Sequence, residues 1–170
     1  MRGWLRSALF EGLVNQMDMK RILMNLGLMM LFVVLASGVS AQIQKPVKWS
    51  YAAKRTSSTT ATLYLRAALD EGWHIYSTGQ KDGGPQKTVF RFEPTKGYVL
   101  LGKLVEPKPK VRHEKVFDMD VQYFEKQVVF TQKIVLKAKQ VLLKGTVEFM
   151  ACTDTSCLPP DEVAFSIPVK

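Results

Sequence analysis

The chain has 170 residues, of which 46% are hydrophobic and 23% charged, with 24 Lys and Arg against 15 Asp and Glu. This length and composition suit one globular domain of ordinary size with a core of its own. The basic balance does not indicate a nucleic-acid surface, because the densest basic stretch, residues 103–115, does not interleave aromatic residues with Arg. We expect no nucleic-acid partner and interpret this stretch as a solvated edge or a docking face for an acidic partner.

Residues 1–41 have the pattern of an export signal. Lys20 and Arg21 supply a positive start, residues 22–35 a mostly apolar core, and residues 36–41 a run of small residues of the Ala-x-Ala kind. Cleavage after this run is predicted. The apolar core is shorter than the roughly 20 residues of a spanning helix, so an uncleaved anchor is the alternative and no stable membrane insertion is expected after cleavage.

The signal does not need residues 1–16, and Met17 or Met19 would each provide a conventional start. The sequence therefore leaves open whether translation starts at Met1 or at one of these methionines. Removal of the signal would leave one exported domain, residues 42–170, with a net charge of +7, because the leader holds four of the basic and two of the acidic residues.

From residue 45 onward, short segments with strand character alternate with turns rich in Gly, Pro, Asp and Lys. In the segment 61–67, Ala and Leu occupy every second position, while Thr62, Tyr64 and Arg66 occupy the positions between them. The segments of strand character are residues 47–51, 61–67, 72–76, 88–92, 98–105, 128–136, 141–149 and 163–169. Their number and spacing predict an all-β fold, an immunoglobulin-like β-sandwich, with a small barrel as the alternative.

The two cysteines of the chain, Cys152 and Cys157, lie in the run Phe149-Met-Ala-Cys152-Thr-Asp-Thr-Ser-Cys157-Leu-Pro-Pro160. Strand-like segments precede and follow this run, which predicts a hairpin with a cysteine at each shoulder of its loop. If the loop folds back on itself, the two Cα atoms can come within the roughly 4.4–6.8 Å of a disulfide. The two cysteines can therefore bond to each other.

A disulfide at this spacing would stabilise the fold only a little. A closed loop of about six residues stabilises a fold by about 2 kcal/mol, against about 4.7 kcal/mol for a loop of a hundred residues. Thiol–disulfide exchange is therefore favoured, with a small structural disulfide as the alternative. Pro159 and Pro160 have no N–H groups and a fixed φ, so they should stiffen one arm of the loop and keep the sulfurs at a rim.

The segment between the cysteines contains no Lys, Arg or His, and the charge of Asp154 would raise a thiol pKa. We expect thiol pKa values near or above about 8.5 and a site that depends on its partner. His74 and His113 do not have the spacing of a zinc finger or ribbon with the cysteines. His74, between Trp73 and Tyr76, is interpreted as a packed aromatic-belt residue, and neither a metal nor a cofactor is expected.

The export signal, the sandwich and the cysteine run together resemble the N-terminal periplasmic domain of the thiol:disulfide interchange protein DsbD. The likeness covers most of residues 45–170, and the cysteine run with its double proline is the most specific part. Asp70-Glu-Gly-Trp73-His-Ile-Tyr76 looks like the family's aromatic strand before a turn. Arg112-His-Glu-Lys-Val-Phe117 is similar to the segment that forms a cap loop over the disulfide in this family.

The resemblance implies a periplasmic redox carrier of the protein-disulfide reductase type. Such a domain accepts two electrons from a thioredoxin-fold partner and passes them to disulfide isomerases or proteins of cytochrome c biogenesis. The full-length family protein continues into a membrane electron-transfer domain and a thioredoxin-like domain. We therefore expect this chain to act with thioredoxin-fold proteins and a membrane electron-transfer protein in trans, the alternative being a non-catalytic binding or scaffold domain.

The resemblance also implies individual roles. Cys157 would form the mixed disulfide with partners and Cys152 would resolve it. Phe117 would be the cap aromatic, and Trp73 and Tyr76 would line the site.

Two departures from the family pattern stand beside these implied roles. The two cysteines are one residue closer together than in the best-known members. Lys115-Val116 replaces the acidic pair expected before the cap aromatic, with Glu114 displaced, so the resemblance does not establish a proton-handling role of those acids here.

Overall fold

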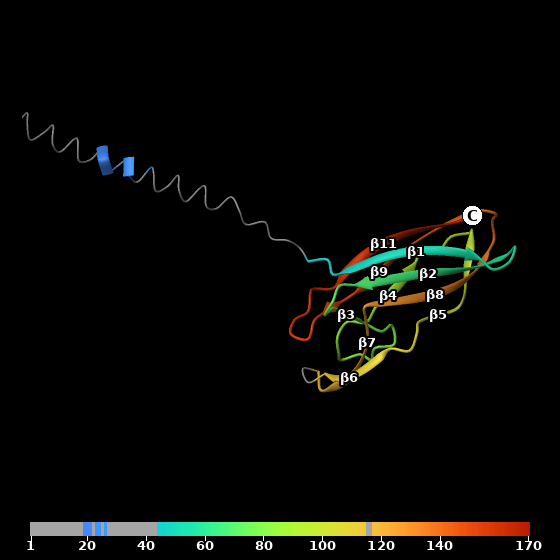
Figure 1. Cartoon of the computed structure of the whole chain (residues 1–170). Coiled ribbons are helices and arrows are strands. Elements are labelled where there is room, and N and C mark those ends of the chain that lie inside the picture. The colour runs from blue at the N-terminus through green and yellow to red at the C-terminus, as the bar shows by residue number, and fades with distance from the viewer. Residues whose placement is uncertain (1–18, 22, 25, 27–43, 115–116) are drawn as a thin grey trace, which may run out of the picture. The chain divides into compact units, whose positions relative to one another are not determined.

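The computed structural model describes residues 19–21, 23, 24, 26, 44–114 and 117–170 (Figure 1). The chain divides into two units, Met1–Gln44 and Lys45–Lys170. In the first unit the six described residues before residue 44 are helical. The predicted cleavage site lies outside the described residues. Within the described parts of the chain, no helix is long and apolar enough to cross a membrane.

Strands make up the regular structure of the described residues in the second unit. They are β1 (Val47–Arg55), β2 (Thr60–Leu69), β3 (His74–Tyr76), β4 (Val89–Phe92), β5 (Tyr98–Val105), β6 (Lys110–Glu114), β7 (Met119–Glu125), β8 (Gln127–Leu136), β9 (Val141–Phe149), β10 (Ala151–Cys152) and β11 (Asp161–Val169). Their hydrogen bonds connect them into three antiparallel sheets, with the orders β1-β2-β8-β5, β10-β3-β7-β6 and β11-β9-β4.

Each predicted segment overlaps a strand, and the bounds of β5 and β9 are those predicted. The hairpin of β6 and β7 was not predicted as strands. Residues 110–114 read Lys-Val-Arg-His-Glu, so apolar and polar residues do not alternate as in the predicted strands. This composition suits β6, because β6 is an edge strand of its sheet and carries polar side chains on both faces. The predicted solvated edge thus exists in part, but as a paired strand.

The main core lies between the first and third sheets. Ala61, Leu63 and Leu65 of β2 are at most 1% exposed, while Tyr64 and Arg66 point to solvent. On the other side, β9 and β11 contribute buried aliphatic and aromatic side chains, and β1 lies against β11. Two sheets packed face to face through one apolar layer form a sandwich. The all-β, immunoglobulin-like sandwich is therefore confirmed over the barrel.

The second sheet has two buried faces with different partners. Side chains alternate between the faces of a strand, so neighbouring residues of β3, β7 and β10 point in opposite directions. One set packs into the main core: Ile75, Phe124 and Ala151. The other set forms a separate apolar cluster: Tyr76, Val121, Tyr123 and Cys152. We call the face with this second set the cysteine face.

Candidate redox site

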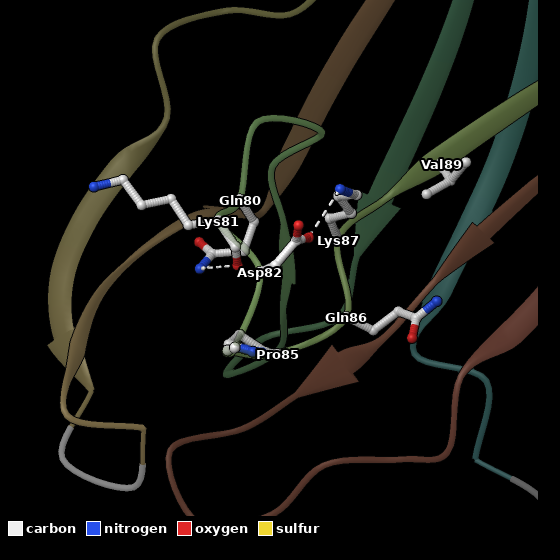
Figure 2. A pocket seen from close by; sticks show the side chains of 9 residues that line it. Gln80, Lys81, Asp82, Pro85, Gln86, Lys87 and Val89 are labelled. Carbon is white, nitrogen blue, oxygen red and sulfur yellow. Dashed lines mark hydrogen bonds and ion pairs between the residues drawn. The ribbon is translucent and has the colours of Figure 1, made fainter.

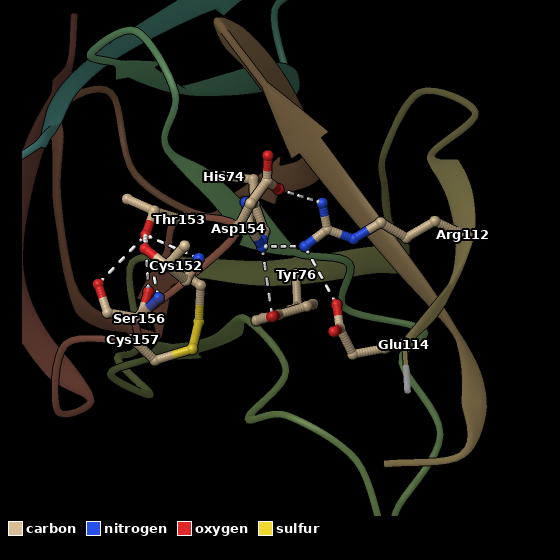
Figure 3. Close-up of a disulfide and its surroundings, with 10 residues drawn as sticks. His74, Tyr76, Arg112, Glu114, Cys152, Thr153, Asp154, Ser156 and Cys157 are labelled. Carbon is tan, nitrogen blue, oxygen red and sulfur yellow. Dashed lines mark hydrogen bonds and ion pairs between the residues drawn. A yellow bond between two sulfur atoms is a disulfide. The ribbon is translucent and has the colours of Figure 1, made fainter. Parts of the chain in front are cut away.

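Cys152 and Cys157 form a disulfide, with their Cα atoms 4.0 Å apart (Figure 3). This distance is shorter than the expected interval because the two residues are a non-hydrogen-bonded pair in a small antiparallel hairpin, where Cα atoms approach most closely. The flanking residues pair through the backbone N–H of Leu158 to Ala151 O at 2.9 Å and that of Thr153 to Ser156 O at 2.7 Å. The predicted loop with a cysteine at each shoulder is confirmed.

The two sulfur-bearing residues differ in exposure. Cys152 is 1% exposed, because it belongs to β10 and its side chain lies in the cluster of the cysteine face. Cys157 is exposed, as are Pro159 and Pro160 beyond it. The expectation that both sulfurs lie at a rim is therefore wrong for Cys152. Among the described residues, it is the Cys157 side of the disulfide that is open to an outside thiolate.

Strand register determines what surrounds Cys152. Residues that face each other across a ladder lie on the same side of the sheet. Cys152 pairs with His74 across β10 and β3, Tyr76 pairs with Tyr123 across β3 and β7, and Arg112 pairs with Val121 across β7 and β6. The cysteine face therefore collects side chains from four strands.

Arg112 is the most connected polar side chain on this face (Figure 3). Its Nη1 donates to Asp154 Oδ1 at 2.7 Å, and its Nη2 lies 3.1 Å from both Glu114 Oε2 and His74 Nε2. The guanidinium carbon lies 4.8 Å from the centre of the Tyr123 ring, a cation–π geometry. The guanidinium thus joins β6 to β3 and to the loop between the cysteines.

His74 is 2% exposed and packs edge-on against Tyr76 and Tyr123, with ring centres 5.4 Å apart in both cases. This agrees with its interpretation as a packed aromatic-belt residue. Burial, and then the charge of Arg112, lower the pKa of His74. Because a guanidinium can only donate, Nε2 accepts from it and the neutral ring carries its proton on Nδ1.

The structure places the other predicted site residues differently from one another. Tyr76 packs with Cys152 in the cluster. Trp73 packs against the main core, and it also lines a cleft of about 410 Å³ that includes Asp154. Phe117 lies in the turn between β6 and β7, is 37% exposed and belongs to neither of the apolar clusters formed by described residues. Its role as a cap stays a prediction.

Sequence reasoning missed Arg112, Glu114 and Tyr123 as parts of the site, and it placed His74 among packed residues only. Arg112 and Glu114 are two residues apart, and side chains at this spacing lie on one face of a strand. Recognition of residues 110–114 as a strand would therefore have placed the two side chains together. Nothing in the local sequence shows which sheet that strand joins.

The loop after β3 is bonded to β7, one of the strands of the cysteine face. Its residues Gln80–Lys87, with Val89, line a polar cleft of about 220 Å³ (Figure 2). Gln80 is 3% exposed, and its Oε1 accepts from the backbone N–H of Gln122 in β7 at 2.7 Å.

Among the described residues, no group of three or more His, Cys, Asp or Glu could hold a metal ion.

A family model described as the N-terminal part of the thiol:disulfide interchange protein DsbD matches residues 41–168. The chain belongs to this family. The matched residues include both the sandwich and the cysteine run, so the resemblance predicted from the sequence is confirmed. A comparison with curated proteins finds no match.

Solved structures agree on the fold of this DsbD N-terminal family member. The N-terminal domain of DsbD from Neisseria meningitidis in its reduced form matches with a TM-score of 0.51 and 15% identity, over 72% of this chain and 84% of that one. The N-terminal periplasmic domain of ScsB from Proteus mirabilis matches with a TM-score of 0.54 and 16% identity, over 77% of this chain and 49% of that one. At these identities the likeness concerns the fold alone.

Proposed function

We propose that the domain is an exported, periplasmic thiol–disulfide exchange module that carries two electrons between proteins through Cys152 and Cys157. The observation that carries this proposal is the unequal exposure of the two cysteines, 1% for Cys152 and an open surface position for Cys157. Exchange needs one sulfur that an outside thiolate can attack. It also needs a second sulfur that is released as a thiolate when the disulfide breaks and that can later re-form the disulfide. The pair meets both needs.

When the domain accepts electrons, a thiolate of a dithiol partner attacks Cys157 Sγ. The intramolecular S–S bond breaks, a mixed disulfide forms, and Cys152 leaves as a thiolate that takes up a proton. The second thiolate of the partner then attacks its own sulfur in the mixed disulfide and releases Cys157. The partner ends as a disulfide and the domain as two thiols, so two electrons have moved.

When the domain donates electrons, the same steps run in reverse. The thiolate of Cys157 attacks a disulfide of the acceptor and forms a mixed disulfide with it. Cys152 then attacks Cys157 Sγ, which restores the intramolecular bond and releases the acceptor as a dithiol. In both directions the exposed sulfur meets the partner.

The proposed partners are thioredoxin-fold proteins and a membrane electron-transfer protein, both acting in trans, with acceptors that include proteins of cytochrome c biogenesis. Family membership supports the chemistry, and the leader pattern supports export. Phe117 is proposed as the cap, because it is carried by the β6–β7 hairpin whose Arg112 reaches the cysteine loop. Tyr76 is proposed to line the buried side of the site, next to Cys152. Trp73 is proposed to line the cleft that also includes Asp154.

Trapping tests the proposed function. In the Cys152→Ser variant the domain has no second thiol to resolve the mixed disulfide, so Cys157 should retain an oxidised thioredoxin-fold protein as an adduct that dithiothreitol releases. The matched Cys157→Ser variant keeps only the buried sulfur and should retain little. If Cys152→Ser collects no partner from a periplasmic extract that contains such proteins, the domain is a non-catalytic scaffold with a structural bridge.

A further inference from the structure

Arg112 is held at the cysteine pair by contacts that come from three segments. Asp154 from the cysteine loop, Glu114 from β6 and His74 from β3 all lie within 3.1 Å of its guanidinium nitrogens. Its side chain is only 26% exposed. Partial burial strengthens the field of a charge, because less water screens it. Because Asp154 belongs to the loop between the two cysteines, this charge is fixed at that loop.

The charges around the cysteines show what this guanidinium does. Asp154 lies between Cys152 and Cys157 in the chain, and a carboxylate there disfavours a thiolate at either one. Arg112 neutralises that carboxylate at 2.7 Å. His74, which faces Cys152 across the ladder, is neutral and brings no charge of its own.

We propose that Arg112 is a positioning residue of the exchange reaction, which compensates the carboxylate of Asp154 and, bonded to His74, holds a positive charge beside Cys152, so that thiolates form more readily. The proposal rests on the proposed function, because thiolates are the reacting species only if the pair exchanges. The segment between the cysteines contains no Lys, Arg or His of its own. The cation comes from β6, 42 residues before the aspartate that it neutralises.

The described residues of the cysteine face carry several other ionisable groups. Lys110 and Glu125 neutralise each other in a pair at 2.7 Å. Arg112 is balanced by Asp154 and Glu114, so removing the guanidinium leaves two carboxylates without a partner. Among the described residues, strand register and contacts place these ionisable groups on the cysteine face: His74 and Tyr76 on β3, Lys110, Arg112 and Glu114 on β6, Tyr123 and Glu125 on β7, and Asp154 in the loop.

The test is the pH dependence of alkylation at Cys157. In the full chain with Cys152→Ser, Cys157 is the one free thiol, and its rate of reaction with iodoacetamide follows the thiolate fraction. Adding Arg112→Gln should move the midpoint of the rate profile upward by up to about one pH unit, a roughly three- to tenfold slower reaction at pH 7. Arg112→Lys, which keeps the charge, should recover most of that loss.

Two further variants separate charge from structural damage. Asp154→Asn removes the carboxylate from a side chain that is 83% exposed, and it should move the midpoint downward, which a loosened fold would not do. Lys110→Gln removes the other cation of the same strand and face, which pairs with Glu125 and not with the carboxylate of the cysteine loop, and it should leave the midpoint in place. Circular dichroism verifies the fold of each variant.

The proposal is overturned if Arg112→Gln folds and leaves the midpoint within about 0.2 units of the Cys152→Ser parent. It is also overturned if Lys110→Gln shifts the midpoint as far as Arg112→Gln does. If Arg112→Gln does not fold, the downward shift in Asp154→Asn alone decides between these outcomes. Because iodoacetamide needs no protein partner, this test can fail while trapping succeeds, and the reverse.

Discussion

Cys152 and His74 face each other across the antiparallel pair of β10 and β3, and both are almost fully buried, at 1% and 2% exposure. Opposite residues on one face of a ladder have their Cβ atoms about 4.5–5.5 Å apart. The imidazole is therefore a fixed neighbour of the sulfur that would leave when Cys157 is attacked. Its protonation affects both the stability of the fold and the environment of that sulfur.

His74 should make the fold less stable at mildly acidic pH. Burial and the charge of Arg112 lower its pKa in the folded state, so below about pH 6.5 the unfolded chain binds the extra proton and the folded chain does not. The free energy of unfolding should therefore fall as pH decreases from about 7, until the pH reaches the folded-state pKa. Urea unfolding at several pH values would measure this.

Replacement of His74 by Gln should flatten that pH dependence, whatever it does to the absolute stability. His113→Gln is the matched control, because that side chain is 54% exposed on the β6–β7 hairpin. Equal slopes in the wild type and His74→Gln would contradict the prediction.

The reduction potential of Cys152–Cys157 should lie well above about −300 mV, the region of structural disulfides. The bond closes a loop of about six residues, so it adds only about 2 kcal/mol to the folded state, and its Cys157 side is open to solvent. Equilibration in dithiothreitol or glutathione buffers measures the potential. A value at or below −300 mV would favour the scaffold alternative. Reduced and oxidised protein should also differ in unfolding free energy by no more than about 2 kcal/mol.

Phe117→Ala should speed the reduction of the disulfide by small thiols, severalfold, while the melting temperature changes little. The side chain is 37% exposed and lies outside both apolar clusters of described residues, so it contributes little to packing, whereas a cap shields the sulfurs from reagents. The rate of reduction by glutathione measures this. Val111→Ala, on the same hairpin and 58% exposed, is the control. An unchanged rate would remove Phe117 from the site.

Gly145→Ala should destabilise the sandwich strongly, by about 1–3 kcal/mol or more. A Cβ at this position would collide with the backbone oxygen of Arg91 and with the ring of Phe165, and a backbone atom cannot move aside cheaply. Chemical denaturation gives the change in unfolding free energy. Gly79→Ala is the matched control, because its Cβ would meet only side-chain atoms at 3.4 Å. Comparable losses in both variants would show that the tight fit at Gly145 is not the cause.

Much of this domain follows from its sequence. The alternation of apolar residues in segments such as 61–67 indicates half-buried strands, because a strand that packs one face on a core must repeat every two residues. Two cysteines with four residues between them in a hairpin loop can be expected to bond, and the short loop argues for chemistry over stabilisation. The family is also recognisable from that run.

The tertiary structure decided which sulfur is open and which charges surround it. Local sequence does not show that β10 joins β3 and thereby buries Cys152, or that a strand of polar residues, β6, completes the same sheet. Arg112 and Asp154 meet across 42 residues because strand pairing and register place them on one face. Charge acts through space, and a pattern read along the chain gives distances only between near neighbours, so the electrostatics of the cysteine pair depend on the fold.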